Sequence, residues 1–301
     1  MPEVYHIPAM LPQVMEGLDI NPSGTYVDVT FGGGGHSYAL FQTLNDEGKL
    51  FSFDQDIEAY LNNRQRFGSD QRWQFVHSNF RYLAQWMDYY GIDRIDGLIA
   101  DLGVSFHHFD TAERGFSFRF EGPLDMRMNQ SGGKTAADIV NTYTEEALAN
   151  ILYLYGELKN SRSLAHRIAQ ARQQKAITRT EELTAVVGQD KKVLTLVFQA
   201  LRIEVNDEMG ALKQMLTAAL QLLKTNGRIA VLTYHSLEDR LVKNFFRAGN
   251  FEGKVEKDFY GNPLTPFRLI EKGATANAQE VADNPRARSA KLRIAQLIQN
   301  Q

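Results

Sequence analysis

The fold is decided by the stretch Val27-Asp28-Val29-Thr30-Phe31-Gly32-Gly33-Gly34-Gly35-His36-Ser37, which leads from a β-branched strand through four glycines into a helix. Glycine lets the backbone approach a ligand closely, and the first turn of a helix offers unpaired amides. Ser37 stands where a dinucleotide-binding fingerprint has its third glycine, so the pattern differs from that fingerprint. The carboxylate of Asp28 favours a cationic ligand group over a pyrophosphate.

Strand patterns recur after this stretch, with helical patterns between them. The predicted strands cover residues 25–30, 50–54, 73–77 and 96–102, and helices are expected at residues 57–66 and 80–90. This alternation predicts a parallel sheet with helices on both faces. A fifth strand follows at residues 228–234, and short candidates at 267–270 and 291–295 could complete the sheet.

The interval between residues 102 and 228 is too long for one strand-helix-strand crossover, which needs roughly 30 residues. A helix at residues 206–223 is expected to precede the fifth strand. The remainder has a mainly helical pattern and is too long for a loop. We therefore interpret residues 104–200 as a helical insert, which divides the sheet domain into residues 1–103 and 201–301.

Composition narrows the class of protein. The 301 residues, 43% of them hydrophobic, can form one large domain or two unequal ones. The chain has no cysteine, which excludes disulfides, thiolate metal sites and cysteine nucleophiles. Apolar runs are only strand-sized and the first residues lack a signal pattern, so we expect no membrane span and a cytoplasmic location. A net charge of −3 still permits a local basic face that binds nucleic acid.

Polar or aromatic residues follow the strands at the edge where ligands of open α/β sheets bind. Asp54 ends the second strand, where a carboxylate accepts hydrogen bonds from a ribose diol in both NAD and S-adenosylmethionine enzymes. Phe80 follows the third strand and could pack against adenine, and Asp101 ends the fourth. Taken singly, the two aspartates could be helix caps and Phe80 a core residue. Together they predict a nucleoside site.

Besides Thr30-Phe31-Gly32-Gly33-Gly34-Gly35-His36-Ser37, six further motifs follow in order. They are Asp101-Leu102-Gly103-Val104-Ser105, Asp110-Thr111-Ala112-Glu113-Arg114-Gly115-Phe116-Ser117-Phe118, Gly122-Pro123-Leu124-Asp125-Met126-Arg127-Met128, Phe198-Gln199-Ala200-Leu201-Arg202-Ile203, His235-Ser236-Leu237-Glu238-Asp239-Arg240 and Asn284-Pro285-Arg286-Ala287-Arg288-Ser289. In these motifs the chain resembles the bacterial 16S ribosomal RNA (cytosine-N4) methyltransferase family, over nearly its whole length.

The resemblance implies a Rossmann-like S-adenosylmethionine methyltransferase sheet with an inserted helical subdomain, to which we assign RNA recognition. It implies methylation of a decoding-centre cytosine in 16S rRNA of the small ribosomal subunit. We expect no metal, because methyl transfer needs none, and the sequence leaves the oligomeric state open, a homodimer included. The implied cofactor contacts are Gly34, Gly35, His36, Asp54, Phe80, Asp101 and His108. The family commonly has Ser-Pro-Gln where this chain has Phe106-His107-His108, but an imidazole can still donate or accept a hydrogen bond.

The residues restrict the chemistry independently. Methylation of cytosine at carbon 5 requires a cysteine that adds to the ring, so the absence of cysteine favours transfer to nitrogen or oxygen. A carboxylate that accepts one N–H of the exocyclic amine would localise the nitrogen lone pair. We assign this role to Asp101, with the alternative that it only binds the methionine end of the cofactor. His235 is a substrate-facing candidate, whereas Ser236 and Asp239 fit a capping box.

Basic residues mark candidate RNA contacts. Residues 158–180 hold six Lys or Arg, among them Arg162 and Arg167, and no acid, which predicts either a phosphate footprint or a solvated face. Arg114 begins a segment in which arginines alternate with three phenylalanines, two of which we expect in the core. Arg286 and Arg288 belong to a second basic cluster near the C-terminus.

Two other functions remain open from the sequence. A related enzyme could methylate amines of DNA or protein on the same scaffold. A ribosome-assembly factor could bind RNA and keep only a vestigial cofactor pocket. A nicotinamide oxidoreductase is disfavoured by Ser37 and Asp28.

Overall fold

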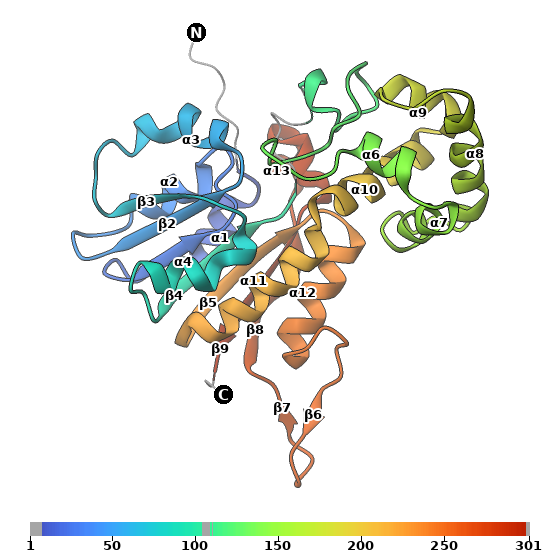
Figure 1. The fold of residues 1–301 in the computed structure, drawn as a ribbon. Helices are drawn as coiled ribbons and strands as arrows, with labels where there is room; N and C mark the ends of the chain where they lie inside the picture. The colour runs from blue at the N-terminus through green and yellow to red at the C-terminus, as the bar shows by residue number, and fades with distance from the viewer. Residues whose placement is uncertain (1–7, 104–108, 110, 299–301) are drawn as a thin grey trace. The chain divides into compact units, whose positions relative to one another are not determined.

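The computed structural model describes residues 8–103, 109 and 111–298, which fall into two compact units (Figure 1). The first unit comprises Met1–Gly103 and Gly210–Gln301, and the second comprises Val104–Met209. The second unit therefore interrupts the first where the strand alternation stops. Its far boundary lies at residue 209, beyond the expected residue 200, because helix α10 continues unbroken to Asn206.

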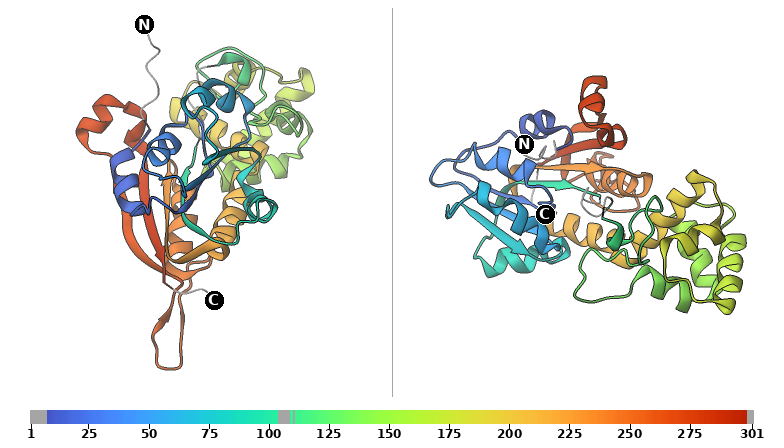
Figure 2. Two further views of the ribbon diagram at one scale, coloured as in Figure 1. Left: turned by 90° about the vertical axis from the view of Figure 1, so that its left-hand side faces the viewer. Right: turned by 90° about the horizontal axis from the view of Figure 1, so that it is seen from above.

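The first unit is built on a seven-stranded sheet with the order β3-β2-β1-β4-β5-β9-β8 (Figures 1 and 2). The strands are β1 Thr25–Asp28, β2 Lys49–Asp54, β3 Trp73–His77, β4 Ile95–Asp101, β5 Leu223–Thr233, β8 Phe267–Thr275 and β9 Lys291–Leu297. Strands β1 to β5 are parallel, and β9 pairs antiparallel with both β5 and β8. The strands expected from the sequence are confirmed.

Strand β5 begins earlier than the sequence pattern predicts. Ile95 pairs with Leu223, but Gly97 pairs with Arg228, so β5 carries extra residues between these pairs. Asn226, in this segment, has a φ of 68°. The expected Asn226-Gly227 turn is therefore an irregularity inside a strand, and it does not mark the start of that strand.

Helices cover both faces of the sheet because successive strand residues point to opposite sides. Val27 and Phe51 pack in one buried cluster with side chains of α4, α11 and α12, whereas Tyr26 and Leu50 pack in another with α1 and α2. The helices are α1 Leu11–Leu18, α2 Gly35–Phe41, α3 Ile57–Asn63, α4 Leu83–Tyr89, α11 Glu208–Leu222, α12 Ser236–Ala248 and α13 Ala278–Asp283, with short 3-10 turns η1 Arg64–Arg66, η2 Phe80–Tyr82 and η4 Pro285–Ser289.

The second unit is mainly helical, as expected, and has its own buried core. It contains η3 Ala112–Arg114, α6 Ala136–Thr142, α7 Glu145–Leu154, α8 Ser161–Gln174, α9 Thr180–Val187 and α10 Lys191–Asn206. In α8, Leu164, Ala165 and Ile168 are buried at the spacing of one helix face. Across the described ranges of both units, no helix combines the length and apolar character needed to cross a bilayer.

A small hairpin between α12 and β8 has no counterpart in the sequence prediction. Its strands, β6 Glu256–Lys257 and β7 Pro263–Leu264, pair antiparallel outside the main sheet. Figure 1 shows it extending away from β8 and α12.

Candidate functional site

The glycine-rich turn after β1 has a backbone that only glycine adopts easily. Gly32 has a φ of +48° and Gly34 a φ of +70°, and α2 begins at Gly35. A Cβ atom at Gly34 would lie 3.0 Å from the Phe31 ring. A Cβ atom built at Gly32 would lie 3.9 Å from the carbonyl oxygen of Thr30, its nearest neighbour in the described part of the chain. The backbone at Gly32 is therefore not covered by other side chains.

Asp54 joins this turn to the end of β2. Its Oδ2 atom accepts a hydrogen bond from the amide of Gly32 at 2.8 Å, and its Oδ1 atom accepts one from the amide of Asp56 at 2.9 Å. The predicted ribose acceptor is therefore held rigidly beside the glycine turn.

Asp101 joins the same turn to the ends of β4 and β5. Its amide donates to Oγ1 of Thr30 at 2.6 Å. The hydroxyl of Tyr234 donates to Oδ1 of Asp101 at 2.6 Å, and Nδ1 of His36 lies 3.6 Å from Oδ2. Burial raises the pKa of Asp101, while His36 and Tyr234 oppose that rise and the nearby Asp28 and Glu238 carboxylates add to it. The side chain remains 21% exposed.

His36 supports Asp101 from inside the fold. Its imidazole is only 5% exposed, and Nε2 lies 3.0 Å from the carbonyl oxygen of Ala9. A carbonyl can only accept a hydrogen bond, so Nε2 must carry a proton and Nδ1 is the nitrogen directed at Asp101. The structure thus gives His36, expected as a cofactor contact, a positioning role, and direct contact with a cofactor stays a prediction.

Asp28 does not present its carboxylate to a ligand, which corrects the expectation from the sequence. It is 1% exposed and accepts hydrogen bonds from Oγ of Ser37 at 2.6 Å and from the amide of Thr30 at 3.0 Å. Burial raises its pKa, and these hydrogen bonds oppose that rise. Ser37 in turn bonds Ser52 at 2.7 Å. Ser37, in place of the third glycine, therefore stabilises the turn through buried hydrogen bonds to Asp28 and Ser52.

Phe80 opens η2 just after β3 and is partly buried against the core of the first unit. Beside it, Nδ2 of Asn79 donates to Oε1 of Gln55 at 3.0 Å, which ties the end of β3 to the end of β2. Phe80 thus lies at the carboxyl edge, meaning the edge of the sheet where β1 to β5 have their C-terminal ends. Stacking against adenine stays a prediction.

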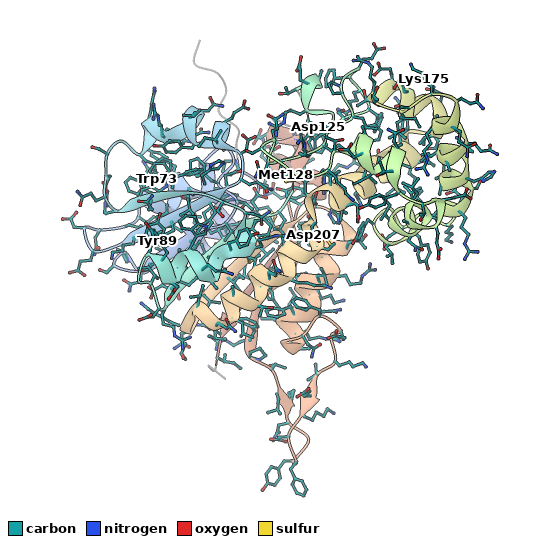
Figure 3. All side chains as sticks on the ribbon, in the orientation of Figure 1. Trp73, Tyr89, Asp125, Met128, Lys175 and Asp207 are labelled. Carbon is teal, nitrogen blue, oxygen red and sulfur yellow. The ribbon has the colours of Figure 1, made fainter. Side chains whose placement is uncertain are left out.

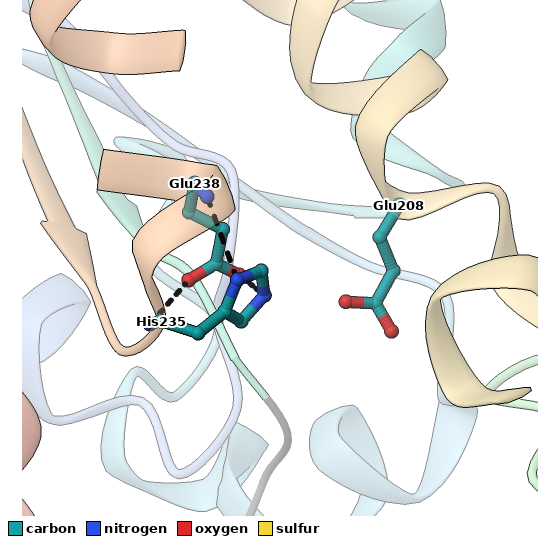
Figure 4. Close-up of side chains that lie close together, drawn as sticks. All are labelled: Glu208, His235 and Glu238. Atoms are coloured by element: carbon teal, nitrogen blue, oxygen red, sulfur yellow. Dashed lines mark hydrogen bonds and ion pairs between the residues drawn. The ribbon is translucent and has the colours of Figure 1, made fainter. Parts of the chain in front are cut away.

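The helix cap after β5 is shifted by one residue from the expected position. The cap of α12 is His235, whose Nδ1 accepts from the amide of Glu238 at 3.5 Å, and not Ser236 (Figure 4). Nε2 of His235 lies 3.1 Å from Oε1 of Glu238, and Oε2 of Glu238 accepts from the amide of Tyr234 at 2.9 Å. The His235 side chain is thus mostly buried and caps α12, and its contact with substrate stays a prediction.

Asp239, expected as a cap, instead pairs across to β9. Its carboxylate receives hydrogen bonds from Arg293 at 2.7 Å and from Lys291 at 3.1 Å. Two cations of the C-terminal basic cluster are therefore neutralised. Arg288 in η4 is exposed, and Arg286 belongs to the same turn, its side chain lying outside the described part of the chain.

Arg114 is buried, which argues against the expected RNA contact. The guanidinium donates to the carbonyl oxygens of Arg127 and Met128, both at 3.1 Å, and so organises the loop around it. The segment after it is a loop, in which Phe116 is buried, Phe118 packs edge-on against Phe198, and Phe120 is exposed.

The basic stretch at residues 158–180 carries less free charge than the sequence indicates, because acids of neighbouring helices approach it. His166 pairs with Glu145 at 3.2 Å, and Lys175 pairs with Glu182 at 2.5 Å (Lys175 is labelled in Figure 3). Arg162 and Arg167 are both exposed on α8. Arg167, which also donates to the carbonyl of Val186, lines a shallow hollow with Gln170, Ala171, Gln173, Gln174 and Val186.

Two site residues were missed by the sequence analysis. Tyr234 and Glu238 complete the surroundings of Asp101. Tyr234 directly precedes the motif that begins at His235, and Glu238 belongs to that motif. An aromatic residue at the end of β5, adjacent to β4, was the available signal. His108, in contrast, lies outside the described residues, and its assignment remains untested.

Comparison with known proteins covers nearly the whole chain. The model of the MraW methylase family matches residues 3–298. The chain is 58% identical over 302 residues to a ribosomal RNA small subunit methyltransferase H of Parabacteroides distasonis, with 98% of each chain covered. It is 56% identical to the protein of that name from Phocaeicola vulgatus and 55% identical to that from Bacteroides thetaiotaomicron, with 98% and 97% of each chain covered, respectively.

Proposed function

Because the chain belongs to the MraW methylase family, we propose that it transfers a methyl group from S-adenosylmethionine to the exocyclic N4 of a cytosine in small-subunit ribosomal RNA. The relatives named above are ribosomal RNA small subunit methyltransferases. The observation that carries the proposal is the hydrogen-bonded link from Asp54 through the glycine turn to Asp101. The link supports the proposal because Asp54, the proposed ribose acceptor, and Asp101, the proposed catalytic carboxylate, end two parallel strands of one sheet.

The described residues fit the proposed cofactor. Asp54 is a carboxylate at the end of β2, the group that accepts hydrogen bonds from ribose hydroxyls, and the open side at Gly32 leaves backbone accessible. The partly exposed Asp101 carboxylate matches a positively charged ligand. When bound, S-adenosylmethionine supplies a methyl group attached to a cationic sulfur. The residues proposed to hold it are Gly34, Gly35, Asp54, Phe80 and Asp101, with His36 behind them.

Asp101 is the proposed catalytic residue. An ionised carboxylate accepts hydrogen bonds and donates none, so it can take one N–H of the amine and leave the nitrogen lone pair directed away from itself. The hydrogen bond from Tyr234 holds Oδ1 in place, and His36 lies beside Oδ2 at 3.6 Å, so the carboxylate has a fixed direction. Positioning of this kind supplies several kcal/mol, up to about 7–11 at the limit. The alternative role, binding the methionine end of the cofactor, uses the same carboxylate.

RNA contacts are proposed for exposed cations. In the second unit, Arg162 and Arg167 are candidates because Arg167 lines a hollow with glutamines that can bond phosphates and base edges. In the first unit, Arg288 is a candidate on η4. Arg114 is left out of the proposal because it is buried.

The test is methyl transfer to purified acceptors. The full-length protein is incubated with methyl-labelled S-adenosylmethionine and with small ribosomal subunits, protein-free 16S rRNA or DNA, and modified nucleosides are then identified by mass spectrometry. We expect N4-methylcytidine in ribosomal RNA. Label in DNA or protein would identify a different acceptor, 5-methylcytidine would contradict the chemistry, and absence of cofactor binding would favour an assembly factor.

A further inference from the structure

The hairpin between α12 and β8 presents two aromatic rings to solvent. Phe259 is 97% exposed and Tyr260 is 86% exposed, at the tip of the hairpin formed by β6 and β7. Their ring centroids lie 5.6 Å apart at an angle of 86°, so each ring contacts the other. Leu264, on β7, is 50% exposed. Adjacent, nearly fully exposed aromatic residues are unusual on a surface that contacts only water.

The tip is held in one conformation. The carboxylate of Asp258 accepts hydrogen bonds from the amides of Tyr260 and Asn262 at 2.9 and 2.8 Å, and from Nδ2 of Asn262 at 2.9 Å. The carbonyl oxygen of Asp258 also accepts from the amide of Gly261 at 3.0 Å. A turn fixed by its own hydrogen bonds presents its side chains with little entropy left to lose on binding.

The base of the hairpin is anchored in the core of the first unit. The ring of Phe251 stacks on Phe245 of α12 at a centroid distance of 5.0 Å, and Nδ2 of Asn244 donates to the carbonyl oxygen of Phe251 at 2.9 Å. The base of the hairpin is therefore packed against α12.

The hairpin leaves the sheet at the edge opposite the carboxyl edge. Phe267, where β8 begins, pairs with Leu297, and the adjoining Gln296 pairs with Arg228 in the N-terminal half of β5. At about 3.3 Å per extended residue, the six steps from Gly253 to Phe259 span at most roughly 20 Å. A partner that places a base at the carboxyl edge and also contacts this tip must reach both ends of the sheet, so it must be a large particle.

We propose that Phe259 and Tyr260 dock into an apolar pocket of a basic protein of the small ribosomal subunit, an inference that rests on the proposed function. Residues 249–266 contain no arginine and carry three acids, Glu252, Glu256 and Asp258, against Lys254 and Lys257. Asp258 directly precedes Phe259, and the segment has a net charge of −1, which disfavours a phosphate backbone and favours a cationic rim around an apolar pocket. The tip is thus a second docking point, separate from the reaction edge.

Photo-crosslinking identifies the occupant directly. Tyr260→p-benzoylphenylalanine is made in the full-length chain and irradiated with purified small ribosomal subunits. Tyr89→p-benzoylphenylalanine is the matched control, because Tyr89 is also an exposed tyrosine of the first unit, at 75%. We expect position 260 to crosslink to one ribosomal protein and position 89 not to crosslink to it. A crosslink to rRNA or to a second copy of the chain, or none, overturns the proposal.

Binding separates this inference from the proposed function. Phe259→Ala/Tyr260→Ala is expected to weaken binding to small subunits at least tenfold, with binding of S-adenosylmethionine unchanged, whereas Tyr89→Ala changes neither. Equal binding by the double variant overturns the docking proposal even if the wild-type protein methylates its RNA. If the wild-type protein crosslinks but transfers no methyl group, the proposed function fails and the docking contact stands.

Discussion

The phenolic oxygen of Tyr234 lies 2.6 Å from Oδ1 of Asp101, across the pair of adjacent strands β5 and β4. Burial raises the pKa of Tyr234, and the Asp101 carboxylate raises it further, so the phenol stays protonated and donates. The ring of Tyr234 also lies where a Cβ atom at Gly103 would come within 3.0 Å of it. The Asp101 carboxylate is therefore oriented by the residue that directly follows the neighbouring strand β5.

Tyr234→Phe should move the acid limb of the pH profile upward. The hydrogen bond from Tyr234 lowers the pKa of Asp101, so removal of the hydroxyl raises that pKa above its already raised value. The rate at saturating cofactor should then fall at a higher pH than in the wild-type protein. Tyr89→Phe, an exposed substitution, is the control, and an unmoved acid limb would show that Asp101 ionisation does not govern the rate.

Asp101→Asn should lower turnover more than cofactor affinity. The amide offers one oxygen in place of two charged ones, so the proposed acceptor for the amine N–H is weakened, and kcat should fall by roughly 10²- to 10⁴-fold. Cofactor affinity is measured separately by calorimetric titration. If affinity and turnover fall together, Asp101 acts by holding the cofactor, and the catalytic assignment is wrong.

Asp54→Asn should weaken cofactor binding by roughly 10- to 100-fold, because charge-assisted hydrogen bonds contribute about 1.5–3 kcal/mol each. Turnover at saturation should change little. Asp56→Asn is the matched control: Asp56 caps α3 by accepting from the amide of Glu58, a task that asparagine also performs. The affinity of both variants for S-adenosylmethionine is measured by titration. If Asp54→Asn binds the cofactor as tightly as Asp56→Asn, Asp54 does not belong to the cofactor site.

Gly34→Ala should lower both stability and cofactor affinity. The φ of +70° costs an L-residue about 1–2 kcal/mol, and the new methyl group would press on Phe31. Gly68→Ala is a control for the backbone strain alone, because Gly68 has a φ of +62° with open space around it. Both variants should lose stability in denaturant unfolding, but only Gly34→Ala should lose cofactor affinity.

Asp239→Asn should destabilise the first unit by about 3 kcal/mol, because it leaves the buried guanidinium of Arg293 without a carboxylate. Burial raises the pKa of Asp239, but hydrogen bonds from Arg293 and Lys291 outweigh burial and hold the pKa below its ordinary value. A lowered folded-state pKa means that the stabilisation is present above the unfolded-state value of about 3.9 and is lost as pH falls through the folded-state value.

Urea unfolding at pH 7 and at pH 3 measures this effect. The difference between Asp239→Asn and wild type should shrink at the lower pH. Asp70→Asn is the comparison, because Asp70 pairs with Arg72 in a more exposed place and its loss should cost less than about 1 kcal/mol. If the difference in unfolding free energy between Asp239→Asn and wild type does not change with pH, the loss comes from packing and not from the ion pair.

The positions of the strands along the chain and the residues that end them could be predicted, because strands follow from hydrophobic patterns; the order of the strands within the sheet was not predicted. The direction of a side chain at a strand end could not. Asp28 and Asp54 both end strands, but Asp28 is buried beneath the turn while Asp54 is bonded to it. The cap at His235 was missed because serine is the commoner cap, and the hairpin because two-residue strands have no alternation to detect.

The adjacency of β4 and β5 has a consequence for synthesis on the ribosome. Ile99 pairs with Ala230, so the whole helical unit must emerge before the middle of the sheet can close. Until then β4 has one unpaired edge, on the side opposite β1, that is open to wrong partners, while the second unit can already fold around its own local core. The nascent chain thus passes through a half-built sheet, a stage at which chaperone binding would have its greatest effect.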